Sequence, residues 1–160
     1  MRVQIIIVCV AFATIASSLN NALAQLHTVS FAELDSLQTV EQRPVVTFIH
    51  TDWCKYCLQM RHTTLNNDSV ISVLNTQFYF IDLNAESKKD INYGGHQFKF
   101  KPTGSDAGVH ELAEQVGMIN GKLDYPTVSV INAKNEIVFQ HGGLLKTNEL
   151  LTVLMEISKI

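Results

Sequence analysis

Positive charge is scarce in this sequence. Only 12 Lys and Arg residues stand against 15 Asp and Glu, which gives a net charge of −3 at neutral pH. The basic residues are scattered, so the chain has no basic stripe for a nucleic-acid backbone, and nucleic acid is not an expected partner. Charged residues make up 17% of the 160 residues and apolar residues 46%, which excludes a disordered chain and indicates one globular domain.

Long apolar runs are also missing, apart from one at the start of the chain. Residues 3–16 are nearly all apolar, follow Met1 and Arg2, and lead to the cleavage signal Ala22-Leu23-Ala24. This pattern is typical of a signal peptide, and the run is shorter than the ~20 residues of a membrane span. The sequence therefore predicts export with removal of residues 1–24, and a domain over residues 25–160. An uncleaved membrane anchor is the alternative.

Cysteine is equally rare. Cys9 lies within the predicted signal peptide, so the exported chain keeps only Cys54 and Cys57. A disulfide between residues three positions apart adds little stability, because disulfide stabilisation grows with the length of the loop that is closed. The pair is therefore predicted to be functional rather than structural. A helix that begins at Cys54 would stabilise the thiolate of that residue, which suits disulfide exchange.

Hydrophobic periodicity predicts alternating helices and strands. The expected helices cover residues 30–39, residues 54–74 with a break at 66–68, residues 109–117, and a final stretch from 147. The expected strands cover residues 45–49, 78–83, 126–131 and 136–140. The first strand is apolar throughout and suits the centre of a sheet, and the polar turn at 132–135 predicts a hairpin between the last two strands.

Residues 85–108 form a polar, glycine-bearing stretch. Residues 97–102 alternate between polar and apolar side chains within it and predict a small hairpin arm. A solvated surface excursion is one interpretation of the whole stretch. The alternative is that Tyr93, Phe98 and Phe100 dock a partner near the cysteines, because long ordered insertions are often functional.

Four motifs in order carry a resemblance to a known family. They are Trp53-Cys54-Lys55-Tyr56-Cys57, Tyr125-Pro126-Thr127, Asn135-Glu136 before an apolar run, and Gly142-Gly143. Together they resemble the thioredoxin superfamily, whose active site is W-C-x-x-C at the junction of a strand and a helix. The resemblance implies an α/β, thioredoxin-like fold, a central mixed β-sheet flanked by helices. Residues 85–108 would be an insertion between the second core strand and the helix that precedes the cis-proline strand.

The resemblance also implies roles for the two thiols. Cys54 would be the solvent-facing nucleophile and Cys57 the shielded resolving thiol, and the two would form the redox-active disulfide. The buried acid that the family places six residues before the first cysteine is Phe48 here. Asp82, at the end of the neighbouring strand, would either replace this acid as a proton acceptor or be an ordinary polar residue at a strand end.

Further residues around the cysteines take implied roles in tuning and docking. Lys55 and Tyr56 occupy the dipeptide that tunes the redox potential, and Trp53 would shape the docking surface. Tyr125 would pair through its backbone with an extended substrate, and Pro126 would be cis and lie against the disulfide. No cofactor or metal is implied.

The expected function is that of a monomeric, exported thiol-disulfide oxidoreductase, similar to the periplasmic carriers of bacteria. The periplasm is the expected location, otherwise the protein is secreted. Disulfide-bearing exported proteins and a membrane or exported electron donor are the expected partners. A reductase is expected, with an oxidase or isomerase as the alternative. A zinc or copper site of His50, Cys54, Cys57 and His62, and a non-enzymatic adaptor, are rival hypotheses.

Overall fold

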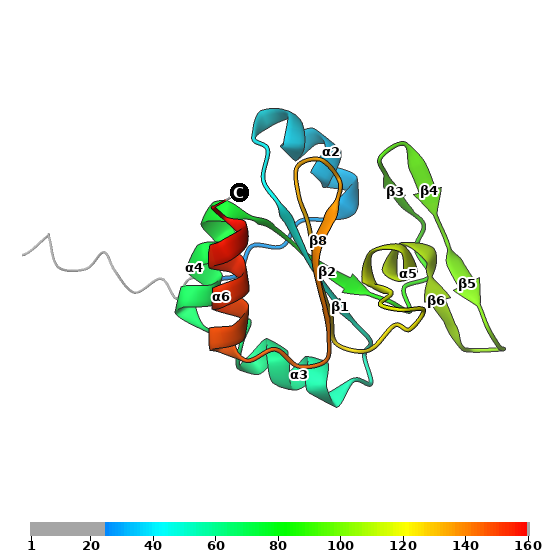
Figure 1. Cartoon of the computed structure of the whole chain (residues 1–160). Helices are drawn as coiled ribbons and strands as arrows, with labels where there is room; N and C mark the ends of the chain where they lie inside the picture. The colour runs from blue at the N-terminus through cyan, green and yellow to red at the C-terminus, as the bar shows by residue number, and fades with distance from the viewer. Residues whose placement is uncertain (1–24, 160) are drawn as a thin grey trace, which may run out of the picture.

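A mixed four-stranded sheet lies at the centre of the folded domain (Figure 1). The computed structural model describes residues 25–159, and the predicted signal peptide over residues 1–24 lies outside the described residues. The strands follow the order β2-β1-β7-β8, in which β1 is parallel to β2 and every other neighbouring pair is antiparallel. Their bounds are β1 (Val45–His50), β2 (Tyr79–Asn84), β7 (Thr127–Ile131) and β8 (Ile137–Gly142). The predicted fold class, with its mixed central sheet, is confirmed.

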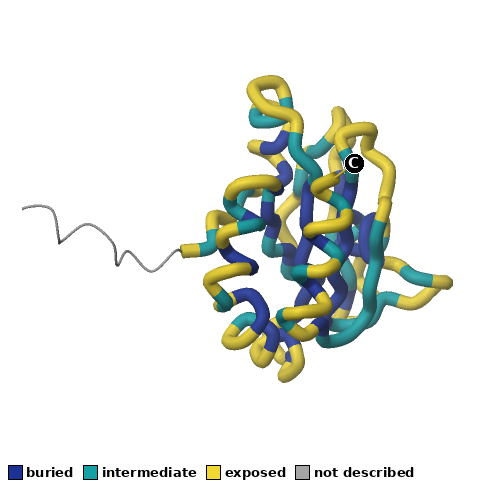
Figure 2. Tube along the Cα trace, turned by 60° about the vertical axis from the view of Figure 1, so that its left-hand side comes forward, coloured by how far each residue is buried: buried dark blue, intermediate teal, exposed yellow. Residues whose placement is uncertain are grey.

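Helices cover both faces of this sheet, which is why all six residues of β1 are buried (Figures 1 and 2). On the face of Val46 and Phe48, the core is closed by α3 (Lys55–His62), α4 (Asp68–Gln77) and α6 (Thr147–Ile157). On the face of Val45 and Ile49, it is closed by α2 (Phe31–Val40) and α5 (Glu111–Gly117). Successive residues of β1 therefore pack against different helices.

Side-chain caps explain where two of the helices begin. Ser30 and Glu33 form a reciprocal capping box at the start of α2. The break predicted at residues 66–68 is the start of α4, where the Asn67 side chain accepts hydrogen bonds from the backbone of Ser69 and Val70. The helix predicted with a break at residues 66–68 is thus two separate helices, α3 and α4.

The inserted stretch folds into two small hairpins, and the prediction of one arm over residues 97–102 is wrong. β3 (Ile91–Tyr93) pairs with β4 (His96–Phe98), and β5 (Phe100–Pro102) pairs with β6 (Gly108–His110). Lys99 divides β4 from β5, because its backbone N–H donates to the Glu111 carboxylate and its carbonyl accepts from the Glu111 backbone. α5 begins at Glu111 rather than at residue 109, since the preceding residues belong to β6.

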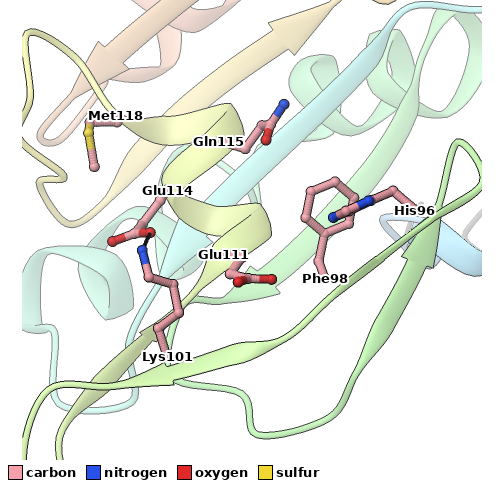
Figure 3. Close-up of a pocket in the computed structure, with 7 residues that line it drawn as sticks. All are labelled: His96, Phe98, Lys101, Glu111, Glu114, Gln115 and Met118. Atoms are coloured by element: carbon pink, nitrogen blue, oxygen red, sulfur yellow. Dashed lines mark hydrogen bonds and ion pairs between the residues drawn. The ribbon is translucent and has the colours of Figure 1, made fainter.

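Two aromatic residues of the insertion, Phe98 and Tyr93, pack against the core on the α5 side of the sheet. Phe98 is 8% exposed in the core on the α5 side of the sheet, and the Tyr93 ring lies 5.0 Å from that of Phe31. Figure 3 shows the hairpins facing α5, where Lys101 makes an ion pair of 2.6 Å with Glu114. Phe98 is therefore not available for docking, whereas Tyr93 and Phe100 are half-buried, and the docking hypothesis for these two stays a prediction.

Within residues 25–159, no helix has the length and apolar character that crossing a membrane requires.

Candidate active site

The two cysteines lie at the start of α3, where the buried strand β1 has just ended. Cys54 is the N-cap of this helix, and its Sγ accepts a hydrogen bond of 3.0 Å from the Cys57 backbone N–H. The two residues form a disulfide with their Cα atoms 5.2 Å apart. Cys54 is 6% exposed and Cys57 is 2% exposed. Cys54 is thus more shielded than the resemblance implies, because its sulfur is turned back onto the first turn of α3.

A rim of exposed apolar side chains surrounds this disulfide. Trp53, Tyr56 and Leu58 are 67%, 64% and 58% exposed. The Trp53 indole N–H donates to both carboxylate oxygens of Glu86 at 3.1 Å, and the Trp53 ring meets the edge of the Tyr125 ring with centroids 5.9 Å apart. These contacts bring together the loop before α3, the start of the insertion and the loop before β7.

The residues before β7 occupy the places that the motifs predict. The Tyr125–Pro126 peptide bond is cis, and Pro126 is buried while Tyr125 is half-buried. Burial, followed by the negative charges of Glu86 and Glu114, raises the pKa of the Tyr125 phenol, so its hydroxyl stays protonated at neutral pH. Lys55, by contrast, is exposed on the first turn of α3.

A charged network lies next to Phe48, the residue at the position of the family's buried acid. Phe48 pairs in register with Asp82 of β2. Asp82 Oδ1 accepts a hydrogen bond of 2.8 Å from His50 Nε2, and both carboxylate oxygens accept from the guanidinium of Arg61 on α3. The Phe48 ring stacks on the His50 ring at 5.7 Å and carries the Arg61 guanidinium 5.1 Å above its centroid. Asp82 is therefore the hub of a charged network and not an isolated strand-end residue.

Residues 33–158 match the thioredoxin-like domain family. The chain belongs to the thioredoxin-like family. With the Cys54–Cys57 disulfide in a C-x-x-C motif next to Trp53, it is a thiol-disulfide oxidoreductase of the thioredoxin type. The non-enzymatic adaptor hypothesis is accordingly set aside.

Solved structures show the same fold. The oxidoreductase DsbH aligns with a TM-score of 0.59 and 16% identity, over 88% of this chain and 91% of that one. A thioredoxin from Thermus thermophilus aligns with a TM-score of 0.59 and 21% identity, over 82% and 86% of the two chains. The C-terminal domain of DsbD from Neisseria meningitidis, in its reduced form, aligns with a TM-score of 0.52 and 21% identity, over 78% and 90%. No curated protein sequence matches this thioredoxin-like chain significantly.

The Asp82 carboxyl is held in its ionised form by its partners. Burial alone would raise its pKa, but the hydrogen bonds from His50 and Arg61, together with the charges of those partners, outweigh burial and lower the pKa below its ordinary value. An ionised Asp82 keeps the imidazole of His50 and the guanidinium of Arg61 in fixed orientations.

The stability of the protein is expected to fall in acid as Asp82 takes up a proton. Because the folded-state pKa lies below the unfolded one, the unfolded chain binds more protons between the two values, and the stabilisation present above about pH 4 is lost as pH falls through the folded-state value. An Asp82→Asn variant should lack this part of the loss. Urea unfolding midpoints of the oxidised proteins between about pH 2 and 6 measure the difference.

The control for this measurement is Asp106→Asn, since Asp106 is exposed between β5 and β6. This variant is expected to follow the wild-type pH dependence. The same acid slope in wild-type and Asp82→Asn protein would contradict the role given to Asp82.

The rival metal set is not assembled. His50 lies beside the disulfide and is engaged with Asp82, whereas His62 is exposed at the end of α3. Within residues 25–159, no three side chains of His, Cys, Asp or Glu gather closely enough to hold a metal ion. The residues predicted for zinc or copper therefore do not form a site.

Sequence reasoning missed two contributions to this site, those of Arg61 and Glu86. The alternation of β1 was a usable signal for His50, since residues two positions apart on a strand share a face and Phe48 and His50 therefore face α3 together. Nothing in the sequence indicates that Arg61 reaches across to Asp82, or that Glu86 receives the indole of Trp53.

Proposed function

We propose that this protein reduces disulfides in exported proteins, with Cys54 as the nucleophile and Cys57 as the resolving thiol. The Cys54 thiolate attacks one sulfur of the substrate disulfide, forms a mixed disulfide and releases the first substrate thiolate. The Cys57 thiolate then attacks Cys54 Sγ, so that the Cys54–Cys57 bond forms and the second substrate thiolate leaves. Two electrons pass from the dithiol to the substrate. The greater exposure of Cys54 and its place at the helix N-terminus support this assignment.

The charges around the disulfide support the proposed direction of electron transfer, from the protein to its substrate. A disulfide is a strong oxidant when its reduced form is stabilised, above all by positive charge near the thiolate. Here the charge of Arg61 is neutralised by Asp82, and Lys55 is exposed, so that water and salt screen it. Glu86 adds negative charge at the rim. The N-terminus of α3 is therefore the main group that stabilises the Cys54 thiolate. A weakly stabilised thiolate favours the disulfide form, so the reduced protein readily gives up its electrons.

The apolar rim supports a polypeptide as the substrate. Exposed apolar side chains that gather in one place mark interaction sites in soluble proteins, and Trp53, Tyr56 and Leu58 flank the two cysteines directly. An extended segment of a misoxidised exported protein fits such a rim, with its backbone beside Tyr125. A monomer with this rim free is the form that we propose for the active protein.

The proposed location is the periplasm, otherwise the exterior of the cell, and it depends on the signal pattern in residues 1–24. Intact mass and N-terminal sequencing of the exported protein test it. A chain that begins at Gln25 is expected, and an uncleaved chain in the membrane fraction would contradict it.

The redox potential tests the direction. Equilibration with glutathione and thioredoxin buffers is expected to give a potential of about −230 mV or lower, close to that of reducing carriers. A value above about −180 mV, where isomerases and strong oxidants lie, would support the oxidase or isomerase alternative instead.

An Asp82→Asn variant leaves the charge of Arg61 unpaired and is expected to raise the redox potential by on the order of 10 mV, whereas Asp106→Asn should leave it unchanged.

A further inference from the structure

A pocket of about 250 Å³ opens beside the disulfide on the side of α3. Its lining includes both cysteines together with His50, Thr51 and Arg61. The Thr51 hydroxyl is buried and makes no hydrogen bond to any part of residues 25–159. The pocket is large enough to hold water, and both His50 and Cys57 line it.

The orientation of His50 makes one of its ring nitrogens a proton acceptor. Its Nε2 lies 2.8 Å from Asp82 Oδ1, so the Nε2–H donates to the carboxylate. In the neutral imidazole the proton is then on Nε2, which leaves the lone pair of Nδ1 free. A carboxylate that accepts a hydrogen bond from one ring nitrogen fixes the tautomer of a histidine, and the other ring nitrogen can then act as a general base.

Asp82 itself is a poor candidate for the proton acceptor. Both of its oxygens accept hydrogen bonds from Arg61, and Oδ1 also accepts from His50. These partners lower the pKa of the carboxyl, so it gives up a proton more readily than it takes one. The hypothesis that Asp82 replaces the family's buried acid is therefore modified, since its place in the network is to orient His50.

We propose that His50 Nδ1 takes up the proton of the Cys57 thiol through water in this pocket, while Asp82 and Arg61 act as positioning residues. The inference rests on the resolving role proposed for Cys57. Removal of the proton gives the Cys57 thiolate, which attacks Cys54 Sγ; the bond between Cys54 and Cys57 forms, and the substrate thiolate leaves and is protonated by solvent. When a dithiol donor later reduces the disulfide, the imidazolium returns the proton to Cys57.

Charged groups from three elements face His50. The charged groups that face it are Asp82 from β2, Arg61 from α3 and, at the mouth of the pocket, Asp52, which accepts a hydrogen bond from Asn84. Because the Nε2–H of His50 is held by Asp82, a proton from Cys57 is expected to arrive at Nδ1, and the resolving step should depend on the presence of this imidazole.

The test separates attack from resolution in one experiment. The reduced protein is mixed with dithiobis-nitrobenzoate, an aromatic disulfide that releases one coloured thiolate when Cys54 attacks and a second when Cys57 resolves the mixed disulfide. The first phase depends on reagent concentration and the second does not. In His50→Gln the second phase should slow on the order of 100-fold at pH 7, while the first phase is kept.

Two further variants keep the proposal falsifiable. His62→Gln removes an exposed imidazole from α3, the helix that carries Cys57, and should leave both phases unchanged. Asp82→Asn should slow the second phase by about tenfold, because the imidazole loses its anionic partner. If His50→Gln does not fold, Asp82→Asn decides. A second phase that is unchanged in His50→Gln, or in Asp82→Asn, would overturn the proposal. Absence of the first phase would instead count against the proposed roles of the cysteines.

Discussion

Replacement of Cys57 by Ser is expected to stop turnover completely and to trap the substrate. Cys54 keeps its place at the N-terminus of α3 and can still attack, but the mixed disulfide that it forms has no resolving thiol. Replacement of Cys54 by Ser should also abolish turnover yet trap nothing, since Cys57 is the more shielded thiol at 2% exposure. Non-reducing electrophoresis with a disulfide-bearing protein substrate, alongside a reduction assay, measures both results.

The comparison of the two serine variants is its own control, because each lacks one thiol and keeps the other. Equal trapping by both would overturn the assignment of roles. Reductase activity that survives in either variant would remove the dithiol mechanism, whatever the redox potential of the wild-type protein.

The largest effect on stability is expected from Phe48→Ala. The Phe48 ring is fully buried, stacks on His50 and lies under the guanidinium of Arg61. Its removal leaves a cavity and two partly buried polar groups without their apolar neighbour, and comparable truncations cost about 3–5 kcal/mol. This is a large share of the roughly 5–15 kcal/mol by which a domain is stable. Urea unfolding of the oxidised protein measures the loss.

Phe48→Leu is the matched variant for this measurement. It keeps most of the buried volume but lacks the flat face on which His50 and Arg61 rest, so a smaller loss of about 1–2 kcal/mol is expected. Equal losses in the two variants would show that the ring face and not the volume matters. A loss below about 1 kcal/mol in Phe48→Ala would contradict the close packing of this ring.

The core strands could be predicted from the sequence because local pattern and tertiary environment agree there. The apolar run at 45–49 lies at the centre of the sheet, and the Asn132–Asn135 turn joins β7 to β8. The insertion was harder, since its alternation over residues 97–102 satisfies a single strand equally well. What divides it is a pair of hydrogen bonds between Lys99 and Glu111, twelve residues apart, and no local pattern records such a contact.

The active site likewise has parts that local sequence patterns predict and parts that they do not. Both cysteines and the proline loop carry local motifs and lie where those motifs predict, at a helix start and before β7. The charged network has no motif, because His50, Arg61 and Asp82 come from three elements. Sequence position alone made Asp82 a candidate, but only the register of β1 against β2 and the reach of Arg61 from α3 show that it orients a histidine.

The environment of Trp53 makes the fluorescence of the protein sensitive to its redox state and to a bound polypeptide. It is the single tryptophan of the chain, it adjoins Cys54, and its ring touches Tyr125 and Glu86. Its emission is therefore set by the disulfide, by the loop before β7 and by whatever displaces water from the rim. Reduction of the disulfide and arrival of a polypeptide should each change the fluorescence intensity or its maximum, without any attached dye. A titration followed at this one indole can thus give a potential and a binding curve from the same unmodified sample.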